Sequence, residues 1–119
     1  MAQPAARFPE TRRPVGVSRG LDDGVVPPAF SSAPYVEAAR AANPDVRYWQ
    51  VRHAQHFDGF LALPAYGARY VPLLPYVYAA LDQVDATLDG SRELPANALI
   101  NANPRGAGSV EASQFAIPR

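Results

Sequence analysis

The chain has 119 residues, which is enough for one domain, and its 11 basic residues balance 11 acidic ones. Neither basic nor acidic residues are clustered, so we expect no nucleic-acid partner. The longest apolar stretch, residues 71–81, is too short to span a bilayer, so we expect no membrane partner. No cysteine is present, which excludes disulfides, thiol catalysis and thiolate metal ligands. We expect no cofactor and no metal, and no signal peptide is visible.

The first half of the chain predicts the order strand, loop, helix, strand. Residues 1–13 are expected to be an irregular lead-in, and the apolar run 14–18, closed by Gly20, predicts a short buried strand. Tyrosine and alanine recur at helical spacing over residues 35–42, and residues 46–51, rich in β-branched and aromatic side chains, predict a second strand. A strand–helix–strand unit favours two parallel strands.

The second half contains one clear element, an amphipathic helix that begins at Leu74 and is ended by Asp89-Gly90. Its apolar residues are spaced by four, three and four positions; they are Val77, Leu81, Val84 and Leu88. Residues 64–70 are expected to be a loop, and residues 91–119 to be mostly irregular because they show no periodicity. Parallel strands normally lie within a larger sheet, so such a fold would be incomplete on its own.

The loop after the first strand, Gly20-Leu21-Asp22-Asp23-Gly24-Val25-Val26-Pro27, places acidic residues just past the strand end. An acid that orients a catalytic histidine must be held at such a fixed point. The spacing from Gly20 and to Pro27 favours Asp23 over Asp22. The same residues are also those of a simple Asp-Gly turn, and this alternative stays open.

The loop after the second strand contains both histidines of the chain, His53 and His56. A general base must titrate near neutrality and reach both nucleophile and leaving group from a loop. A small or polar residue, His and Phe in succession after a strand resemble the usual Gly-His loop of the hydrolase fold, and this resemblance selects His56 as the base. An alternative is a metal cluster of His53, His56 and Asp58, although neither a helix nor a cysteine sets its geometry.

Asp23 and His56 follow the chain order of α/β-hydrolases, in which the nucleophile precedes the acid and the histidine. None of the serines lies in Gly-x-Ser-x-Gly, and the oxyanion hole normally accompanies that nucleophile. We therefore expect an α/β chain, the C-terminal part of an α/β-hydrolase fold with about two parallel strands, two helices and an irregular tail. Its missing partner would be the N-terminal half of the same enzyme, and alone it would be inactive.

Aromatic side chains could line an ester pocket, although such residues more often form the core. They are Trp49, Phe57, Phe60, Tyr66, Tyr70, Tyr76 and Tyr78.

Longer strings resemble the C-terminal region of the 3-hydroxybutyrate oligomer hydrolases. They are Gly-Leu-Asp-Asp-Gly-Val-Val-Pro-Pro-Ala-Phe-Ser-Ser-Ala-Pro-Tyr (20–35), Tyr-Trp-Gln-Val-Arg-His-Ala-Gln-His-Phe-Asp-Gly-Phe (48–60), Ala-Arg-Tyr-Val-Pro-Leu-Leu-Pro-Tyr (68–76), Leu-Pro (94–95) and Pro-Arg-Gly (104–106). The resemblance covers residues 14–106 and leaves 107–119 as a tail. Arg19 departs from it, because these hydrolases commonly have histidine there.

The resemblance implies an extracellular or periplasmic serine esterase that hydrolyses small esters, the oligomers of 3-hydroxybutyrate, with Asp23 as acid and His56 as base. Two alternatives remain. The chain could be part of another α/β-hydrolase, a tannase-like or feruloyl-type esterase or a peptidase, since fold and triad do not fix the substrate. It could also be a non-catalytic remnant or interaction module.

Overall fold

The computed structural model describes residues 14–106, 108 and 112–119, so the expected lead-in over residues 1–13 lies outside the described part. The strands are β1 (Val15–Gly20), β2 (Val46–Val51) and β3 (Ala98–Ile100), and the helices are α2 (Ser32–Ala42), α3 (Pro64–Arg69) and α4 (Leu74–Leu88). Three short 3-10 helices are η1 (Pro28–Phe30), η2 (Asp58–Ala62) and η3 (Ala112–Gln114).

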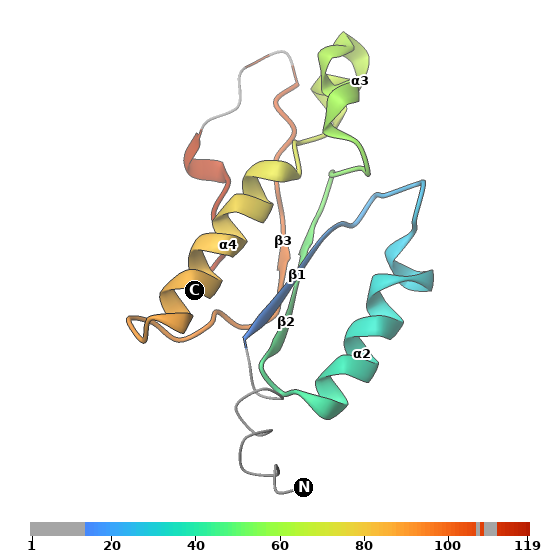
Figure 1. Cartoon of the computed structure of the whole chain (residues 1–119). Coiled ribbons are helices and arrows are strands. Elements are labelled where there is room, and N and C mark those ends of the chain that lie inside the picture. The colour runs from blue at the N-terminus through green and yellow to red at the C-terminus, as the bar shows by residue number, and fades with distance from the viewer. Residues whose placement is uncertain (1–13, 107, 109–111) are drawn as a thin grey trace, which may run out of the picture.

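The three strands form one parallel sheet in the order β1-β2-β3 (Figure 1). Val15 pairs with Val46 and Gly20 with Val51, so β1 and β2 end at the same level. The parallel pairing of the first two strands is therefore confirmed. All three strands point the same way, which brings the loops after β1 and β2 to one edge of the sheet.

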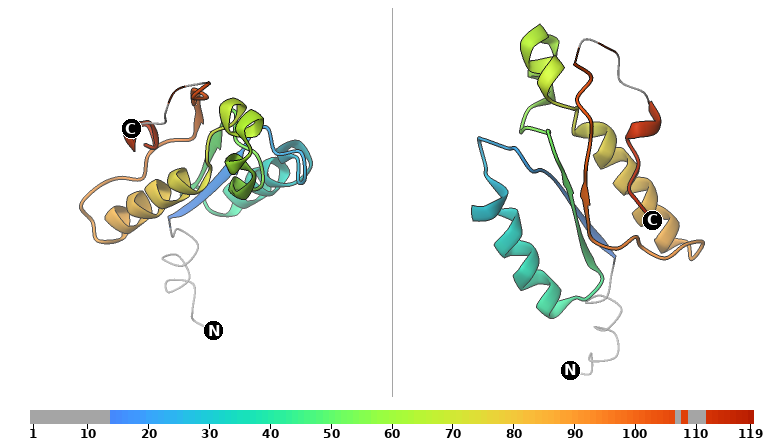
Figure 2. Two further views of the ribbon diagram at one scale, coloured as in Figure 1. Left: turned by 90° about the horizontal axis from the view of Figure 1, so that it is seen from above. Right: turned by 180° about the vertical axis from the view of Figure 1, so that it is seen from behind.

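Helices cover the sheet on opposite faces, α2 on one and α4 on the other (Figures 1 and 2). The cause is the alternation of side chains along β2. Val46 and Tyr48 pack against Val36 of α2, whereas Trp49 and Val51 belong to the core on the α4 side. Four of the six residues of this central strand are thus buried, two in each layer, whereas Arg47 and Gln50 are only partly buried.

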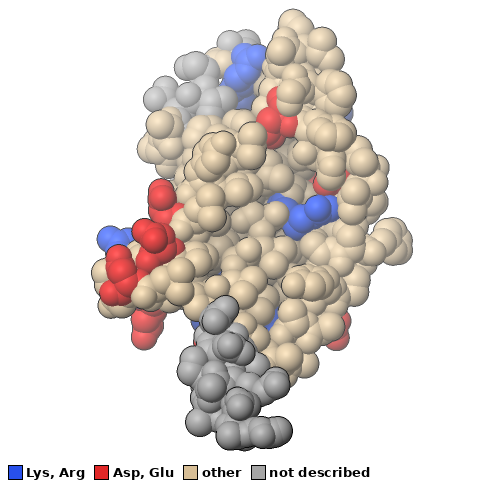
Figure 3. All heavy atoms as spheres, in the orientation of Figure 1, with Lys and Arg blue, Asp and Glu red and all other residues tan. Residues whose placement is uncertain are grey.

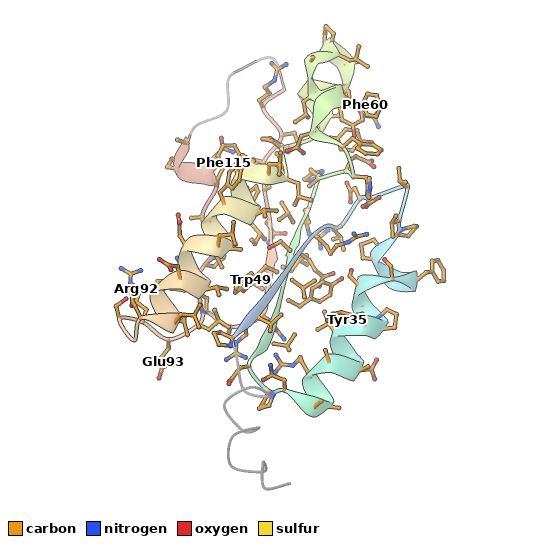
Figure 4. All side chains as sticks on the ribbon, viewed as in Figure 1. Tyr35, Trp49, Phe60, Arg92, Glu93 and Phe115 are labelled. Atoms are coloured by element: carbon orange, nitrogen blue, oxygen red, sulfur yellow. The ribbon has the colours of Figure 1, made fainter. Side chains whose placement is uncertain are left out.

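Trp49 lies between the sheet and α4 and is completely buried (Figure 4). Its indole N–H donates to the carbonyl oxygen of Ala96 at 2.9 Å, so the one polar atom of the ring is satisfied. Gly16 on β1 makes room for the ring, since a Cβ atom there would lie 2.4 Å from it. The side chain of Asn97 accepts a bond from the Tyr48 N–H at 2.8 Å and continues the pairing of β2 with β3.

One expectation about the second half is wrong. Residues 64–70 are not a plain loop, because α3 occupies Pro64–Arg69 with proline in its first turn. The described residues after 91 are mostly irregular, as expected, but they contain β3, and Ile117 of the tail is 4% exposed within the main core. The sheet therefore has three strands rather than about two. A strand of three residues is too short to show a periodic pattern, which is why it was not predicted.

Helix α4 has the expected bounds, but its buried residues are Tyr76 and Ala80. Leu81 and Leu88 are 59% and 66% exposed. The face with Val77, Leu81 and Val84 lines an apolar hollow of about 270 Å³ together with Gly16 and Ser18 of β1. Among the described residues nothing pairs with the outer edge of β1. This part of the molecule thus presents an uncovered apolar surface beside an open strand edge.

Charge is unevenly distributed on the face that α4 presents. Acidic side chains gather over one end of this helix, and most of the remaining surface in this view is uncharged (Figure 3). None of the helices in the described ranges has the length and apolar character required to cross a bilayer.

Candidate active site

The two loops at the carboxyl ends of β1 and β2 are joined by hydrogen bonds from the first loop to the second. The N–H of Leu21 donates to the Val51 carbonyl at 2.8 Å, and that of Asp22 to the Ala54 carbonyl at 3.1 Å. The side-chain oxygen of Gln55 accepts the Gly24 N–H at 3.1 Å. The loop after β1 is therefore fixed to the residues immediately before His56.

Asp23 is buried, with 5% of its surface exposed, and its carboxylate is held by the backbone of its own loop. The N–H groups of Val25 and Val26 donate to Oδ1 at 2.9 and 2.8 Å. This is the geometry of an Asx turn, in which a short acidic side chain satisfies the next backbone donors. The turn aims the second carboxylate oxygen, Oδ2, at the neighbouring loop.

Oδ2 of Asp23 lies 2.8 Å from Nδ1 of His56. Burial raises the pKa of Asp23, but the hydrogen bonds from Val26, His56 and Val25 and the charge of His56 outweigh it, and the net pKa lies below the ordinary value of 3.8. The carboxyl group is therefore ionised at neutral pH and can only accept, so the proton of this bond is on Nδ1. Nε2 remains as the ring nitrogen that can take a proton.

The His56 side chain is 30% exposed and borders a second hollow, also of about 270 Å³. Phe57, Leu74 and Val77 contribute apolar walls to it. Val77 also lines the hollow along β1 and α4, so the two adjoin. The histidine thus faces space beside the uncovered surface described above.

Asp58 anchors the chain that follows His56. Its two carboxylate oxygens accept the N–H groups of Leu73 and Leu74, each at 2.8 Å, at the start of α4. A carboxylate at a helix N-terminus satisfies unpaired donors and interacts favourably with the helix dipole. The histidine loop is therefore attached to α4 on one side and to the acid loop on the other.

The proposed metal cluster is not assembled. His53 lies beside Asp22, with Nδ1 3.9 Å from Oδ2, on the outer side of the two loops. Its backbone φ of 61° turns the chain at the end of β2, and Asp58 is directed to α4. Within the described ranges no three His, Cys, Asp or Glu side chains form a group that could hold a metal ion.

The aromatic residues divide between core and surface. Trp49 and Tyr76 are core, whereas Phe57, Phe60 and Tyr78 are at least half exposed. A row of rings in mutual contact starts at His56 and continues along η2 and α3, where Phe60 lies (Figure 4). Its members are His56, Phe57, Phe60, Tyr66 and Tyr70. Some of these aromatic residues thus form the core, and others form a partly exposed row of rings next to His56.

Two polar residues of the site, Gln55 and Arg19, were given no role from the sequence, although Arg19 stands out there as a departure from the family's usual histidine. Gln55 binds the acid loop, and Arg19 places Nη2 3.2 Å from Oδ2 of Asp23. In the sequence, the only signal for a role of Gln55 in the site is its position next to His56. A basic residue four positions before Asp23 was a visible signal for Arg19, but the spacing has no special meaning outside a helix.

A buried carboxylate bonded to Nδ1 of a partly exposed histidine, both on loops at the ends of parallel strands, is typical of hydrolases that use histidine as general base. Comparison with known proteins identifies a family of hydrolases. The family model of the 3HB-oligomer hydrolases matches residues 6–118. The chain belongs to this family.

Curated relatives named D-(-)-3-hydroxybutyrate oligomer hydrolase are similar to the chain. The protein from Polaromonas sp. (strain JS666) is 41% identical over 97 residues, which are 79% of this chain and 14% of the relative. That from Cupriavidus metallidurans is 35% identical over 103 residues, 83% of this chain and 14% of the relative. The chain thus spans about one seventh of the length of these relatives. No solved structure matches it.

Proposed function

We propose that this chain is the acid–histidine segment of a serine esterase that hydrolyses short oligomers of 3-hydroxybutyrate. The observation that carries the proposal is the 2.8 Å contact between Oδ2 of Asp23 and Nδ1 of His56. The family match and the names of the relatives support the substrate class. The C-terminal part of an α/β-hydrolase fold remains the architecture that best fits the three parallel strands.

In the proposed reaction, Nε2 of His56 takes the proton of a serine hydroxyl as that oxygen attacks the ester carbonyl. The imidazolium is stabilised by the ionised Asp23 and then protonates the departing alcohol, leaving an acyl-enzyme. His56 next takes a proton from water as that water attacks the acyl group. The imidazolium then returns the proton to the serine oxygen as the bond between this oxygen and the acyl carbon breaks, which releases the acid. Asp23 stays ionised throughout, because its hydrogen bonds all favour the charged form.

The nucleophile is proposed to come from sequence outside this chain. No serine hydroxyl of the described residues is hydrogen-bonded to His56. The hollow beside His56 adjoins the apolar surface of β1 and α4 through Val77, and the relatives are about seven times longer. A segment of the parent enzyme that covers this surface would be close enough to bring a serine to Nε2 of His56.

The test uses a hybrid enzyme, in which this chain replaces the matching 97-residue segment of the Polaromonas relative. Hydrolysis of 3-hydroxybutyrate dimer is measured for the hybrid, for His56→Gln and for the matched control His53→Gln. Because a triad needs its base, His56→Gln should lower kcat/KM by roughly 10³-fold or more, and His53→Gln by less than about threefold.

Three outcomes would contradict the proposal. Equal activity of the His56 and His53 variants would remove His56 from the reaction. Faster hydrolysis of aryl esters than of the dimer would favour another esterase. Turnover of the dimer by the 119-residue chain alone, lost in His56→Gln, would place the nucleophile within this chain. The extracellular or periplasmic location implied by the resemblance is a separate proposal, tested by cell fractionation.

A further inference from the structure

Arg19 lies one residue before the end of β1, and its guanidinium reaches back over the acid loop. Nη2 is 3.2 Å from Oδ2 of Asp23 and also donates to the carbonyl oxygen of Val26. The Arg19 side chain is 21% exposed and that of Asp23 only 2%. The Arg19 guanidinium therefore links the end of β1 to Val26 near the end of the acid loop, and it also contacts Asp23 within that loop.

Three hydrogen bonds and one ion pair meet at the Asp23 carboxylate. Oδ1 accepts the N–H groups of Val25 and Val26, and Oδ2 is hydrogen-bonded to Nδ1 of His56. Nη2 of Arg19 forms an ion pair with the same Oδ2. Arg19 and His56 therefore share one carboxylate oxygen.

The orientation of Arg19 leaves one of its own donors unsatisfied. Its Nε is buried with no hydrogen-bond partner among the described residues. A buried donor without a partner is unfavourable, and the guanidinium could satisfy it by turning toward solvent. Its present orientation instead places Nη2 on the acid and on Val26.

The charge of Arg19 has a second consequence. When His56 takes a proton, the negative Asp23 stabilises the imidazolium, and a cation on the same oxygen opposes that stabilisation. The other charged or titratable groups near the pair are Asp58 of η2 and Tyr66 of α3. The remaining neighbours, Asp22 and His53, face each other on the outer side.

We propose that Arg19 is a positioning residue of the site. It holds Oδ2 of Asp23 in line with Nδ1 of His56, and its charge limits how strongly Asp23 retains the protonated imidazole. The catalytic role of Asp23 and His56 rests on the proposed function. The contacts of Arg19 with Asp23 and Val26 are independent of that function.

The experiment replaces Arg19 by Met, which removes charge and hydrogen bonds, by Gln, which removes the charge but can still donate to Val26, and by Lys, which keeps the charge. Arg52→Met is the matched control, because Arg52 is an exposed arginine just after β2. Folding of each variant is checked by the fluorescence of Trp49, the single buried tryptophan. If Arg19→Met does not fold, Arg19→Gln decides.

Two readouts are made. In the 119-residue chain, NMR follows the pH titration of the two histidine rings, with His53→Gln assigning the signals of His56. In the hybrid enzyme, the pH profile of kcat/KM for the dimer is recorded. Loss of the cation should move the His56 midpoint, and the acidic limb of the profile, upward by about half to one pH unit in Arg19→Met and Arg19→Gln. Arg19→Lys and Arg52→Met should stay within about 0.2 unit, since both leave a cation at position 19.

The outcomes separate the two proposals. An upward shift of the His56 midpoint in the 119-residue chain, together with a hybrid that has no esterase activity, would support the role of Arg19 and contradict the proposed function. An active, His56-dependent hybrid whose acidic limb is unchanged in Arg19→Met and Arg19→Gln would overturn the role of Arg19. Equal losses of activity in the Met, Gln and Lys variants without any shift would show a structural role only, and would also overturn it.

Discussion

Gly20 lies directly against Ala54: a Cβ atom on Gly20 would stand 2.5 Å from the Ala54 carbonyl oxygen. Gly20 ends β1, and Ala54 lies between the two histidines of the other loop. The acid and the histidine loops approach each other this closely because position 20 has no side chain. The contact between Asp23 and His56 depends on that approach.

Gly20→Ala should therefore destabilise the protein by about 1–3 kcal/mol, because the Ala54 carbonyl belongs to the backbone and cannot rotate away. Urea unfolding of the 119-residue chain measures the free energy. Gly59→Ala is the control, since a Cβ atom there would meet nothing within 4 Å. Equal stability of the two variants would show that the loops can separate without cost.

The lowered pKa of Asp23 predicts how stability changes with pH. A carboxyl group whose pKa falls on folding stabilises the folded state fully above its unfolded pKa, near 3.8, and loses this contribution as pH falls through the lower folded value. The native chain should exceed Asp23→Asn in free energy of unfolding at pH 6, and the difference should shrink below about pH 3.8.

Urea unfolding from pH 6 to pH 2 measures this difference. Asp22→Asn removes an exposed carboxylate from the same loop and controls for the change of net charge. A gap between the native chain and Asp23→Asn that stays constant down to pH 2 would contradict a lowered pKa.

Asp58 is predicted to stabilise the start of α4. Asp58→Ala removes the acceptors of the Leu73 and Leu74 N–H groups and should cost about 0.5–2 kcal/mol. Asp82→Ala, on an exposed position within α4, should change stability by less than about 0.5 kcal/mol. Thermal or urea unfolding gives both values, and hydrogen exchange at Leu73 and Leu74 should quicken in Asp58→Ala alone.

Ile117 is predicted to be a core residue despite its place near the end of the chain. Truncation to alanine should cost about 2–4 kcal/mol, because the side chain is 4% exposed within the main cluster. Leu88→Ala, at a position 66% exposed, should cost less than about 1 kcal/mol. A negligible effect of Ile117→Ala would mean that the tail does not pack on the core in solution.

Local sequence determined much of this protein. The strand at residues 46–51 and the helix from Leu74 to Leu88 were predicted with the bounds that the structure has, because apolar pattern and turn residues act over a few positions. The choice of Asp23 over Asp22 and of His56 over His53 followed from the resemblance of their loops to the acid and histidine loops of α/β-hydrolases. The structure places the two chosen side chains 2.8 Å apart.

Tertiary structure alone decided the rest, because these features depend on contacts between distant parts of the chain. Strand β3 is too short to carry a pattern and exists through its pairing with β2, to which Asn97 adds a side-chain bond. Ile117 is buried only because the tail returns to the core. Arg19 meets Asp23 only because the loop after β1 folds back on itself, so a spacing with no meaning in an extended chain becomes an ion pair.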